Sequence, residues 1–132
     1  MIKGIGIDSV EINRFTHWHT YSDMQLLRIF SIEEIAYCRS NQLKSAERFA
    51  VRYAAREALF KSLQQNITHQ IPFLRVCKAT TIKKDTHGRP SLVVDWQLIG
   101  CASLHDCVIW LSLTHTKNSA TAMILLEKKI SR

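Results

Sequence analysis

Apolar and polar positions recur with a helical period over the longest patterned segment of the chain, RFAVRYAAREALFKSL at residues 48–63. At about 100° per residue, one stripe of this helix is apolar and consists of Phe49, Tyr53, Phe60 and Leu63. A second face carries Glu57 and Lys61 beside small alanines. Because most of the circumference is apolar, the pattern predicts a buried helix from about residue 45 to residue 65.

Glu57 and Lys61 lie one helical turn apart, and this spacing has two interpretations. On a solvated face, such a pair contributes only about 0.2 to 0.5 kcal/mol to helix stability. Here the apolar neighbours argue against free solvation, and buried charges, including those of Arg52 and Arg56, need partners. The segment therefore favours a functional site over a surface ion pair.

The N-terminal residues 2–10 alternate with the period of a β-strand. Ile5 and Ile7 fall on one face of this strand, and the opposite face consists of Gly4, Gly6 and Asp8. Asp8 thus follows two glycines, where another group can approach the backbone closely. The glycines do not form a dinucleotide-binding fingerprint, because the G-x-G-x-x-G spacing and the helix after it are absent.

Two short helices are predicted before the long one. Residues 11–21 are compatible with a short helix, and Ser31 with Glu34 forms a capping box for a helix that runs to about Arg39.

Beyond Pro72 the pattern changes to β. Residues 74–83 and 91–96 predict two strands, and the turn chemistry of residues 85–88 between them predicts a hairpin. Residues 108–115 and 120–127 predict two more strands, and one face of the first consists of Ile109, Leu111, Leu113 and His115. The chain therefore mixes α and β elements, without internal repeats.

Composition indicates one globular domain, residues 1–132, since 46% of the residues are hydrophobic and only 4 are Gly and 2 are Pro. No apolar stretch is long enough for a membrane span, and the N-terminus lacks a signal sequence, so we expect a cytoplasmic protein with no membrane association. The cysteines show no C-x-x-C spacing. We expect them to be reduced and partly buried, without a metal.

A net charge of +7 predicts an acidic partner. The Lys and Arg residues form no block and do not interleave with aromatic residues, so nucleic-acid binding has no motif to support it. A basic nucleic-acid-binding module nevertheless stays open as one alternative, and a catalytically silent scaffold as another. The first predicts affinity that falls steeply with salt and needs no Mg²⁺.

Asp8 and Glu57 are hard oxygen ligands, and a site with few carboxylates, waters and substrate phosphates suits Mg²⁺. Lys61 is placed to neutralise a phosphate, and His115, at a strand end, to bind a phosphate or move a proton. These residues indicate metal-assisted transfer at phosphate. Each signal alone is weak, because a lone Asp after glycines is usually a turn residue and a strand-end His is often structural.

Their order along the chain is more specific. Four segments resemble the holo-[acyl-carrier-protein] synthase family of phosphopantetheinyl transferases: GIGIDSVEINRF, RFAVRYAAREALFKSL, HGRPSL and LSLTHTKNSATAMILLE. FSIEEIAYC, residues 30–38, resembles the second helix of that family. The resemblance spans almost the whole chain. It implies an α+β fold in which a small antiparallel sheet packs on a long buried helix, and a homotrimer with active sites between neighbouring subunits.

The resemblance also implies a reaction. The family transfers 4'-phosphopantetheine from coenzyme A to a serine of apo acyl carrier protein, releases adenosine 3',5'-bisphosphate and supports fatty acid biosynthesis. Asp8 and Glu57 match its magnesium ligands, and Glu57 is implied to deprotonate the serine through a water. Lys61 matches its phosphate-contacting lysine, and His115 its histidine near the coenzyme phosphates.

Two further groups of residues match binding segments of the family. Gly88, Arg89 and Pro90 match the loop by the adenine end of the coenzyme. Arg14 matches the basic first helix that docks the acidic carrier. Arg28 lies near it in sequence, and the apolar residues of this segment give a composition suited to docking an acidic helix.

The chain departs from the family pattern at several positions. Arg56 stands where the family most often has Lys, Thr114 replaces a Ser, and Ser9 replaces an aliphatic residue. Residues 64–66, Gln-Gln-Asn, stand where the family usually has a turn with glycine near the phosphates. Without glycine, we expect the backbone to approach the coenzyme less closely.

Overall fold

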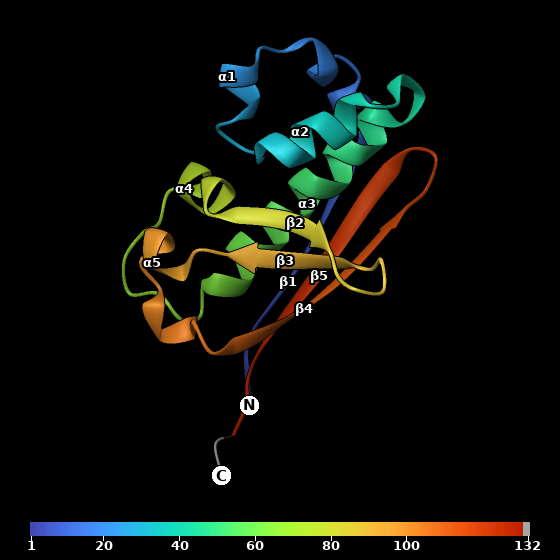
Figure 1. Cartoon of the computed structure of the whole chain (residues 1–132). Coiled ribbons are helices and arrows are strands. Elements are labelled where there is room, and N and C mark those ends of the chain that lie inside the picture. Colours follow the sequence, from blue (N-terminus) through green and yellow to red (C-terminus); the bar gives the residue numbers. More distant parts are fainter. Residues whose placement is uncertain (131–132) are drawn as a thin grey trace.

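The computed structural model describes residues 1–130, in which a three-stranded sheet packs against one long helix, α3 (Ser45–Leu63) (Figure 1). The sheet is antiparallel with the order β1-β5-β4, and its strands are β1 (Ile2–Glu11), β5 (Ser119–Lys128) and β4 (Cys107–His115). These strands and the helix agree with the sequence to within a few residues. The predicted α+β class, with a small antiparallel sheet on a long buried helix, is confirmed.

Gly4 and Gly6 bring β1 close to α3. A Cβ atom on Gly4 would lie 2.0 Å from the Ser62 carbonyl oxygen, and one on Gly6 would lie 1.9 Å from the Ala58 carbonyl oxygen. The group that approaches the strand at these glycines is therefore the helix backbone. The close approach brings the next residue on the same face, Asp8, against the helix.

Short helices connect β1 to α3. They comprise two 3-10 helices (Ile12–Phe15 and Trp18–Thr20), α1 (Asp23–Leu26), α2 (Ile32–Arg39) and a 3-10 turn (Gln42–Lys44). The short helix predicted over residues 11–21 is thus two 3-10 turns. The capping box of α2 is confirmed, since Ser31 N donates to Glu34 Oε1 at 3.1 Å and Glu34 N donates to Ser31 Oγ at 3.2 Å.

The strand predicted over residues 74–83 is wrong in its first half. Residues Phe73–Lys78 form helix α4, and strand β2 begins only at Thr80 (Thr80–Lys84). Val76 and Cys77 are both fully buried. Consecutive residues of a strand point to opposite faces, so a strand with one face in solvent would expose one of them. A buried helix face explains both positions, and Pro72 precedes its first turn.

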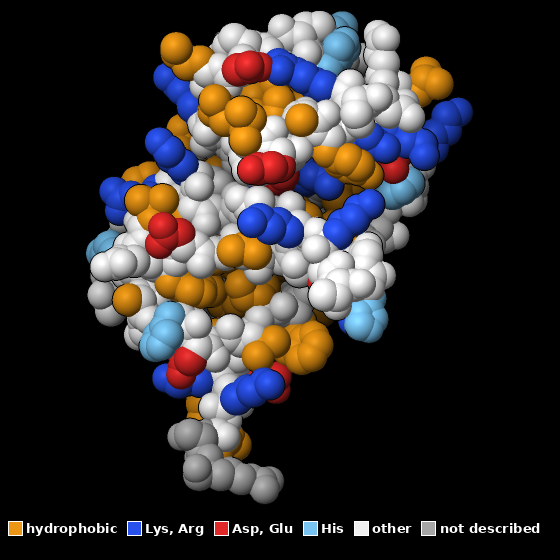
Figure 2. All heavy atoms as spheres, viewed as in Figure 1, with side chains coloured by type: hydrophobic (Ala, Val, Ile, Leu, Met, Phe, Trp, Pro, Cys, Tyr) orange, Lys and Arg blue, Asp and Glu red, His pale blue; other side chains and the backbone are white. Residues whose placement is uncertain are grey.

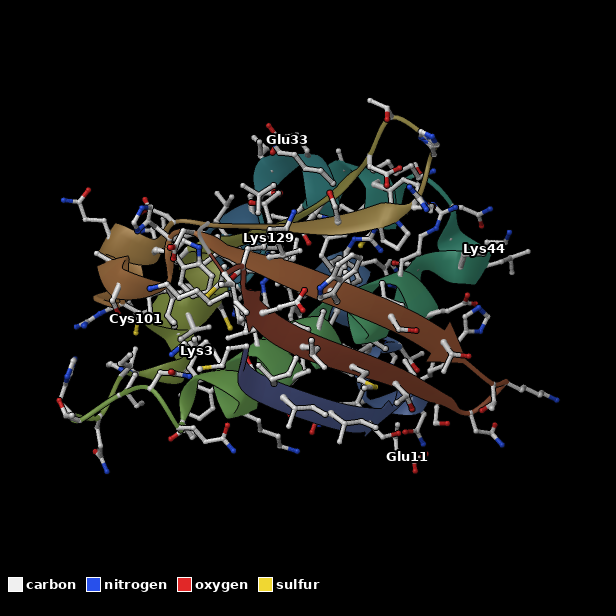
Figure 3. The ribbon with its side chains drawn as sticks, turned by 90° about the horizontal axis from the view of Figure 1, so that it is seen from below. Lys3, Glu11, Glu33, Lys44, Cys101 and Lys129 are labelled. Carbon is white, nitrogen blue, oxygen red and sulfur yellow. The ribbon has the colours of Figure 1, made fainter. Side chains whose placement is uncertain are left out.

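The hairpin predicted after α4 is present, with β2 paired antiparallel to β3 (Pro90–Val94). The strand predicted over residues 91–96 ends early, because Trp96 begins helix α5 (Trp96–Ile99), which is followed by a 3-10 turn (Ala102–Leu104). Strand β3 lies beside β4, so the hairpin extends the molecule beyond the edge of the sheet opposite β1 (Figure 3).

No element of residues 1–130 covers the outer face of the sheet, which is seen in Figure 3. Its exposed apolar side chains include Ile5, Ile7 and Trp110, with exposed fractions of 51%, 58% and 56%. The predicted burial of the cysteines holds for Cys38, Cys77 and Cys101, and all four thiols are free. Within residues 1–130, no helix has the length and apolarity to cross a membrane.

Candidate functional site

Asp8, Glu57 and Lys61 come together where β1 crosses α3. The Lys61 ammonium donates to Asp8 Oδ1 at 2.8 Å and to the Ile7 carbonyl oxygen at 3.1 Å. The side chain of Asp8 is 9% exposed and that of Lys61 is 54% exposed, so the pair lies at the border between core and solvent. The hydrogen bond to Asp8 raises the pKa of Lys61, which keeps the ammonium charged.

The Asp8 and Glu57 carboxyls lie next to each other. Burial, followed by the neighbouring Asp8 carboxyl, raises the pKa of Glu57 to about 6. The second oxygen of Asp8, Oδ2, is buried and has no hydrogen-bond partner among residues 1–130. Two adjacent carboxylates with an unpaired buried oxygen form an incomplete polar cluster, and a cation would complete it.

These two carboxylates fit Mg²⁺. Mg²⁺ prefers oxygen ligands and is usually held by one or two carboxylates together with waters and substrate phosphates. Among residues 1–130, no group of three or more His, Cys, Asp and Glu side chains is placed to hold a metal. The chemistry of the donors suits a metal that keeps open positions for phosphate oxygens.

Arg14 and Tyr53 border the same cluster. The Arg14 guanidinium lies 5.4 Å from the centre of the Tyr53 ring and 5.4 Å from that of Phe15. Its positive charge acts on Glu57, where it lowers the pKa and opposes the larger effect of burial. Arg14 is therefore an exposed cation at the rim of the carboxylate pair. The sequence did not single out Tyr53 as a site residue, because its place in the apolar stripe indicated only packing.

His115 lies elsewhere. Its Nε2 atom is 2.7 Å from Glu47 Oε1, near the start of α3. Glu47 precedes Glu57 by ten residues, which corresponds to about 15 Å along a helix. The structure therefore separates His115 from the Asp8 cluster within one chain. His115 borders a hollow of about 390 Å³ that is also lined by Leu43, Thr116 and Lys117.

The loop with Gly88, Arg89 and Pro90 is the tip of the β2–β3 hairpin. Asp85 organises it by accepting hydrogen bonds from the backbone N–H groups of His87 and Arg89 at 2.8 and 2.9 Å. Gly88 has a φ of 77°, a backbone conformation that glycine adopts without strain because it has no Cβ atom. The hairpin lies beyond β4, whereas Asp8 lies on β1, so the two sit at opposite edges of the sheet (Figures 1 and 3).

Arg28 lines a separate hollow of about 460 Å³ between α1 and α4. Three cationic and three apolar side chains form this wall: Arg28, Arg75, Lys78, Met24, Leu27 and Leu74. On the face seen in Figure 2, Lys and Arg side chains are likewise interspersed with hydrophobic ones and form no continuous block. Sequence reasoning missed Arg75 and Lys78, because it assigned residues 74–83 to a strand.

The turn after α3 is formed without glycine. The Asn66 side chain donates from Nδ2 to the Lys3 carbonyl oxygen at 2.7 Å, and the Asn66 backbone N–H donates to the Leu63 carbonyl oxygen at 2.9 Å. Within residues 1–130, no residue other than glycine has a positive φ. The Gln-Gln-Asn sequence thus ends the helix through a side-chain bond to β1.

Comparison with known proteins agrees with this fold. A family model described as the 4'-phosphopantetheinyl transferase superfamily matches residues 4–122. A holo-[acyl-carrier-protein] synthase from Geotalea daltonii is 36% identical over 132 residues, covering 97% of this chain and 100% of the relative. One from Bacillus subtilis is 30% identical over 129 residues, covering 97% of this chain and 98% of the relative.

Solved structures show the same relationship. A holo-(acyl-carrier-protein) synthase from Bacillus anthracis, in complex with CoA (3',5'-ADP), is 28% identical with a TM-score of 0.72 and covers 98% of this chain and 99% of its own. An ACPS–CoA complex from Chronobacterium ammoniagenes is 26% identical with a TM-score of 0.75, covering 96% and 98%. Family model, curated relatives and solved structures agree over nearly the full length: this chain belongs to the 4'-phosphopantetheinyl transferase superfamily.

Proposed function

We propose that this chain is a holo-[acyl-carrier-protein] synthase that transfers 4'-phosphopantetheine from coenzyme A to a serine of apo acyl carrier protein and releases adenosine 3',5'-bisphosphate. The observation that carries the proposal is the cluster of Asp8, Glu57 and Lys61, which combines two adjacent carboxylates with a partly exposed ammonium. The curated relatives bear the name of this activity, and two of the similar structures contain coenzyme A or its fragment.

Asp8 and Glu57 are the residues that would hold Mg²⁺, and the unpaired Oδ2 of Asp8 supports this assignment. When bound, Mg²⁺ supplies charge neutralisation at the pyrophosphate of coenzyme A. The chain itself contributes the orientation of both carboxylates. Lys61 holds Asp8 through Oδ1 and leaves Oδ2 available.

The chemical step needs a proton acceptor and a site for negative charge. The serine oxygen attacks the phosphorus that carries the pantetheine group, and the bond from that phosphorus to the oxygen of adenosine bisphosphate breaks. Glu57, beside the position that the serine would occupy, takes up the serine proton through a water. The exposed end of Lys61 offsets the negative charge that develops on the leaving group.

Charge and shape support docking of an acidic carrier near Arg14 and at the hollow that Arg28 lines. Arg14 lies at the rim of the carboxylate pair, so a partner bound there would place its serine near Glu57. The hollow at Arg28 adds cations around an apolar centre, a composition that complements an acidic helix with apolar side chains.

A homotrimer with active sites between neighbouring subunits completes the proposal. Within one chain, His115 and the Gly88–Pro90 hairpin tip lie apart from the Asp8 cluster, so a single coenzyme molecule needs a second subunit to reach all of them. The uncovered outer face of the sheet, with Ile5, Ile7 and Trp110, supplies apolar area for such an assembly.

The nucleotide product tests the proposed function. With coenzyme A, Mg²⁺ and apo carrier protein, chromatography should detect adenosine 3',5'-bisphosphate, and a carrier whose modified serine is replaced by alanine should yield none. Release that is independent of the carrier would indicate a hydrolase. Absence of release at all Mg²⁺ concentrations would refute the assignment.

A further inference from the structure

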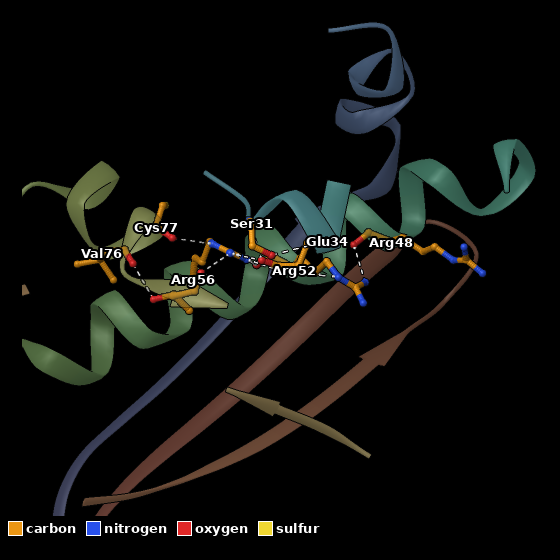
Figure 4. Close-up of polar contacts among 8 residues, drawn as sticks. Ser31, Glu34, Arg48, Arg52, Arg56, Val76 and Cys77 are labelled. Carbon is orange, nitrogen blue, oxygen red and sulfur yellow. Dashed lines mark hydrogen bonds and ion pairs between the residues drawn. The ribbon is translucent and has the colours of Figure 1, made fainter. Parts of the chain in front are cut away.

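Arg56 is the largest fully buried side chain among the described residues, with an exposed fraction of 0%. It directly precedes Glu57 on α3, and its guanidinium lies between α2, the end of α4 and the start of β2 (Figure 4). A buried side chain cannot touch coenzyme or carrier. Any effect of Arg56 on the reaction must therefore pass through the segments that it contacts.

Every nitrogen of the Arg56 guanidinium donates a hydrogen bond. Arginine has five N–H donors in a planar fork. Nη1 and Nη2 donate to the two carboxylate oxygens of Glu34 at 3.0 and 2.6 Å. The remaining acceptors are three backbone carbonyl oxygens, those of Cys77 at 3.2 Å, Thr80 at 2.7 Å and Arg52 at 3.3 Å.

Three of the residues that accept these bonds lie on elements other than α3. Glu34 belongs to α2, Cys77 lies in the last turn of α4, and Thr80 is the first residue of β2. Strand β2 leads to the hairpin tip with Gly88, Arg89 and Pro90. One guanidinium thus links the helix that carries Glu57 to the first residue of the hairpin's first strand.

We propose that Arg56 is a positioning residue, which sets the rotation of α3 at Glu57 and the placement of the β2–β3 hairpin through its bonds to Glu34, Cys77 and Thr80. This inference rests on the proposed function, since it assigns Glu57 to the reaction and the hairpin tip to coenzyme binding. A buried ion pair adds little net stability compared with apolar replacements, so the value of the Arg56–Glu34 pair lies in the geometry that it imposes.

Two variants separate positioning from stability. Arg56→Lys keeps the charge opposite Glu34 but has only three donors, so some of the acceptors lose their hydrogen bonds. The double variant Glu34→Gln/Arg56→Met removes both charges of the bidentate pair together. Arg52, whose Nε atom lies 3.8 Å from Glu34 Oε2, keeps contact with solvent through a side chain that is 15% exposed. The glutamine introduced at position 34 still accepts the hydrogen bond from Ser31 N, because glutamine also completes a capping box.

Steady-state kinetics and hydrogen exchange provide the measurements. In both variants we expect a cooperative thermal transition, a KM for coenzyme A raised at least about fivefold, a kcat lowered at least about tenfold, and a KM for the carrier changed by less than about twofold. Backbone amides of residues 80–94 should exchange faster than in the unmodified protein. Arg39→Lys, in the surface ion pair with Asp23, is the matched control and should leave all these values unchanged.

Three results would overturn the proposal. They are a folded double variant with unchanged kinetics, a kinetic defect without faster exchange in the hairpin, and loss of cooperative folding in both variants, which would make Arg56 a residue of stability alone. If the unmodified protein shows no transfer, the proposed function fails. In that case, hydrogen exchange is the only test of the positioning role. Faster exchange in the hairpin of the two variants supports that role, and unchanged exchange overturns it.

Discussion

Asp8 is the residue on which the proposed site depends most. One of its oxygens holds Lys61 at 2.8 Å, and the other is buried without a partner in the part of the chain that the structure describes. An unsatisfied buried carboxylate oxygen is unfavourable, and it persists where a ligand fills the position. The neighbouring Glu57 shares this environment, which raises its pKa to about 6 through burial and through Asp8.

Replacement of either carboxylate should abolish most of the transfer. We expect Asp8→Asn and Glu57→Gln each to lower kcat/KM at least about a hundredfold, because each removes one of the two carboxylates that are proposed to hold Mg²⁺. The melting temperature should change little, since the ion pair to the half-exposed Lys61 contributes about 1 kcal/mol or less. Glu11→Gln, an exposed position on the same strand, is the control. Turnover of either variant at the unmodified rate would remove these residues from the mechanism.

The buried thiols predict a pattern of chemical reactivity. Burial raises the pKa of Cys38 and of Cys77 to about 12, so both thiols stay protonated at pH 8 and react slowly. Mass spectrometry after brief treatment of the folded protein with iodoacetamide should find label first on Cys107, which is only partly buried. Labelling of Cys38 and Cys77 at the rate of Cys107 would show that the helices around them open readily.

At the scale of elements, the sequence predicted those whose signals are local. The helical period of α3 was sufficient to predict that helix, and the capping box of Ser31 and Glu34 was sufficient to predict the start of α2. Each of these signals depends only on neighbours within a few residues. Helix α4 was missed, since its short apolar run lacks a distinctive period and its burial depends on α3. The acceptors of Arg56 and the Glu47 partner of His115 could not be predicted either, because the fold brings them from distant parts of the chain.

Because β1 and α3 are in close contact, adding one methyl group at Gly6 should strongly lower the free energy of unfolding. Gly6→Ala should lower the free energy of unfolding by about 2 to 4 kcal/mol, because the new Cβ would lie 1.9 Å from a carbonyl oxygen of the helix. Gly88→Ala is the matched comparison, since no atom lies within 4 Å of its Cβ position and only its φ of 77° is unfavourable. We expect about 1 kcal/mol there. Urea unfolding measures both, and equal losses would contradict close packing at Gly6.

At the scale of the whole molecule, the proposed site is divided. Asp8 and Glu57 lie at the β1 edge of the sheet, whereas the hairpin lies beyond β4 at the other edge (Figure 3). His115 is the last residue of β4, two strands away from β1. In a trimer with shared sites, the Asp8 cluster of one subunit would face the His115 region and hairpin of its neighbour.

Mixed assemblies test this division. An assembly made only of Asp8→Asn subunits, or only of His115→Ala subunits, should be nearly inactive. Co-expression of the two variants should restore a fraction of the transfer rate, because some sites then combine an intact Asp8 from one subunit with an intact His115 from its neighbour. The activity of isolated mixed assemblies, purified with two different tags, is the measurement. If mixed assemblies are no more active than the pure variants, each site is built from one chain.

The central claim is that the Asp8–Glu57–Lys61 cluster transfers phosphopantetheine to a carrier protein. The most direct measurement is the intact mass of an apo acyl carrier protein after incubation with coenzyme A, Mg²⁺ and this protein, with Asp8→Asn in a parallel reaction. We expect the carrier to gain the mass of one phosphopantetheine group with the unmodified protein, and little or none with the variant. An unmodified carrier in the first reaction, or equal modification in both, would contradict the account.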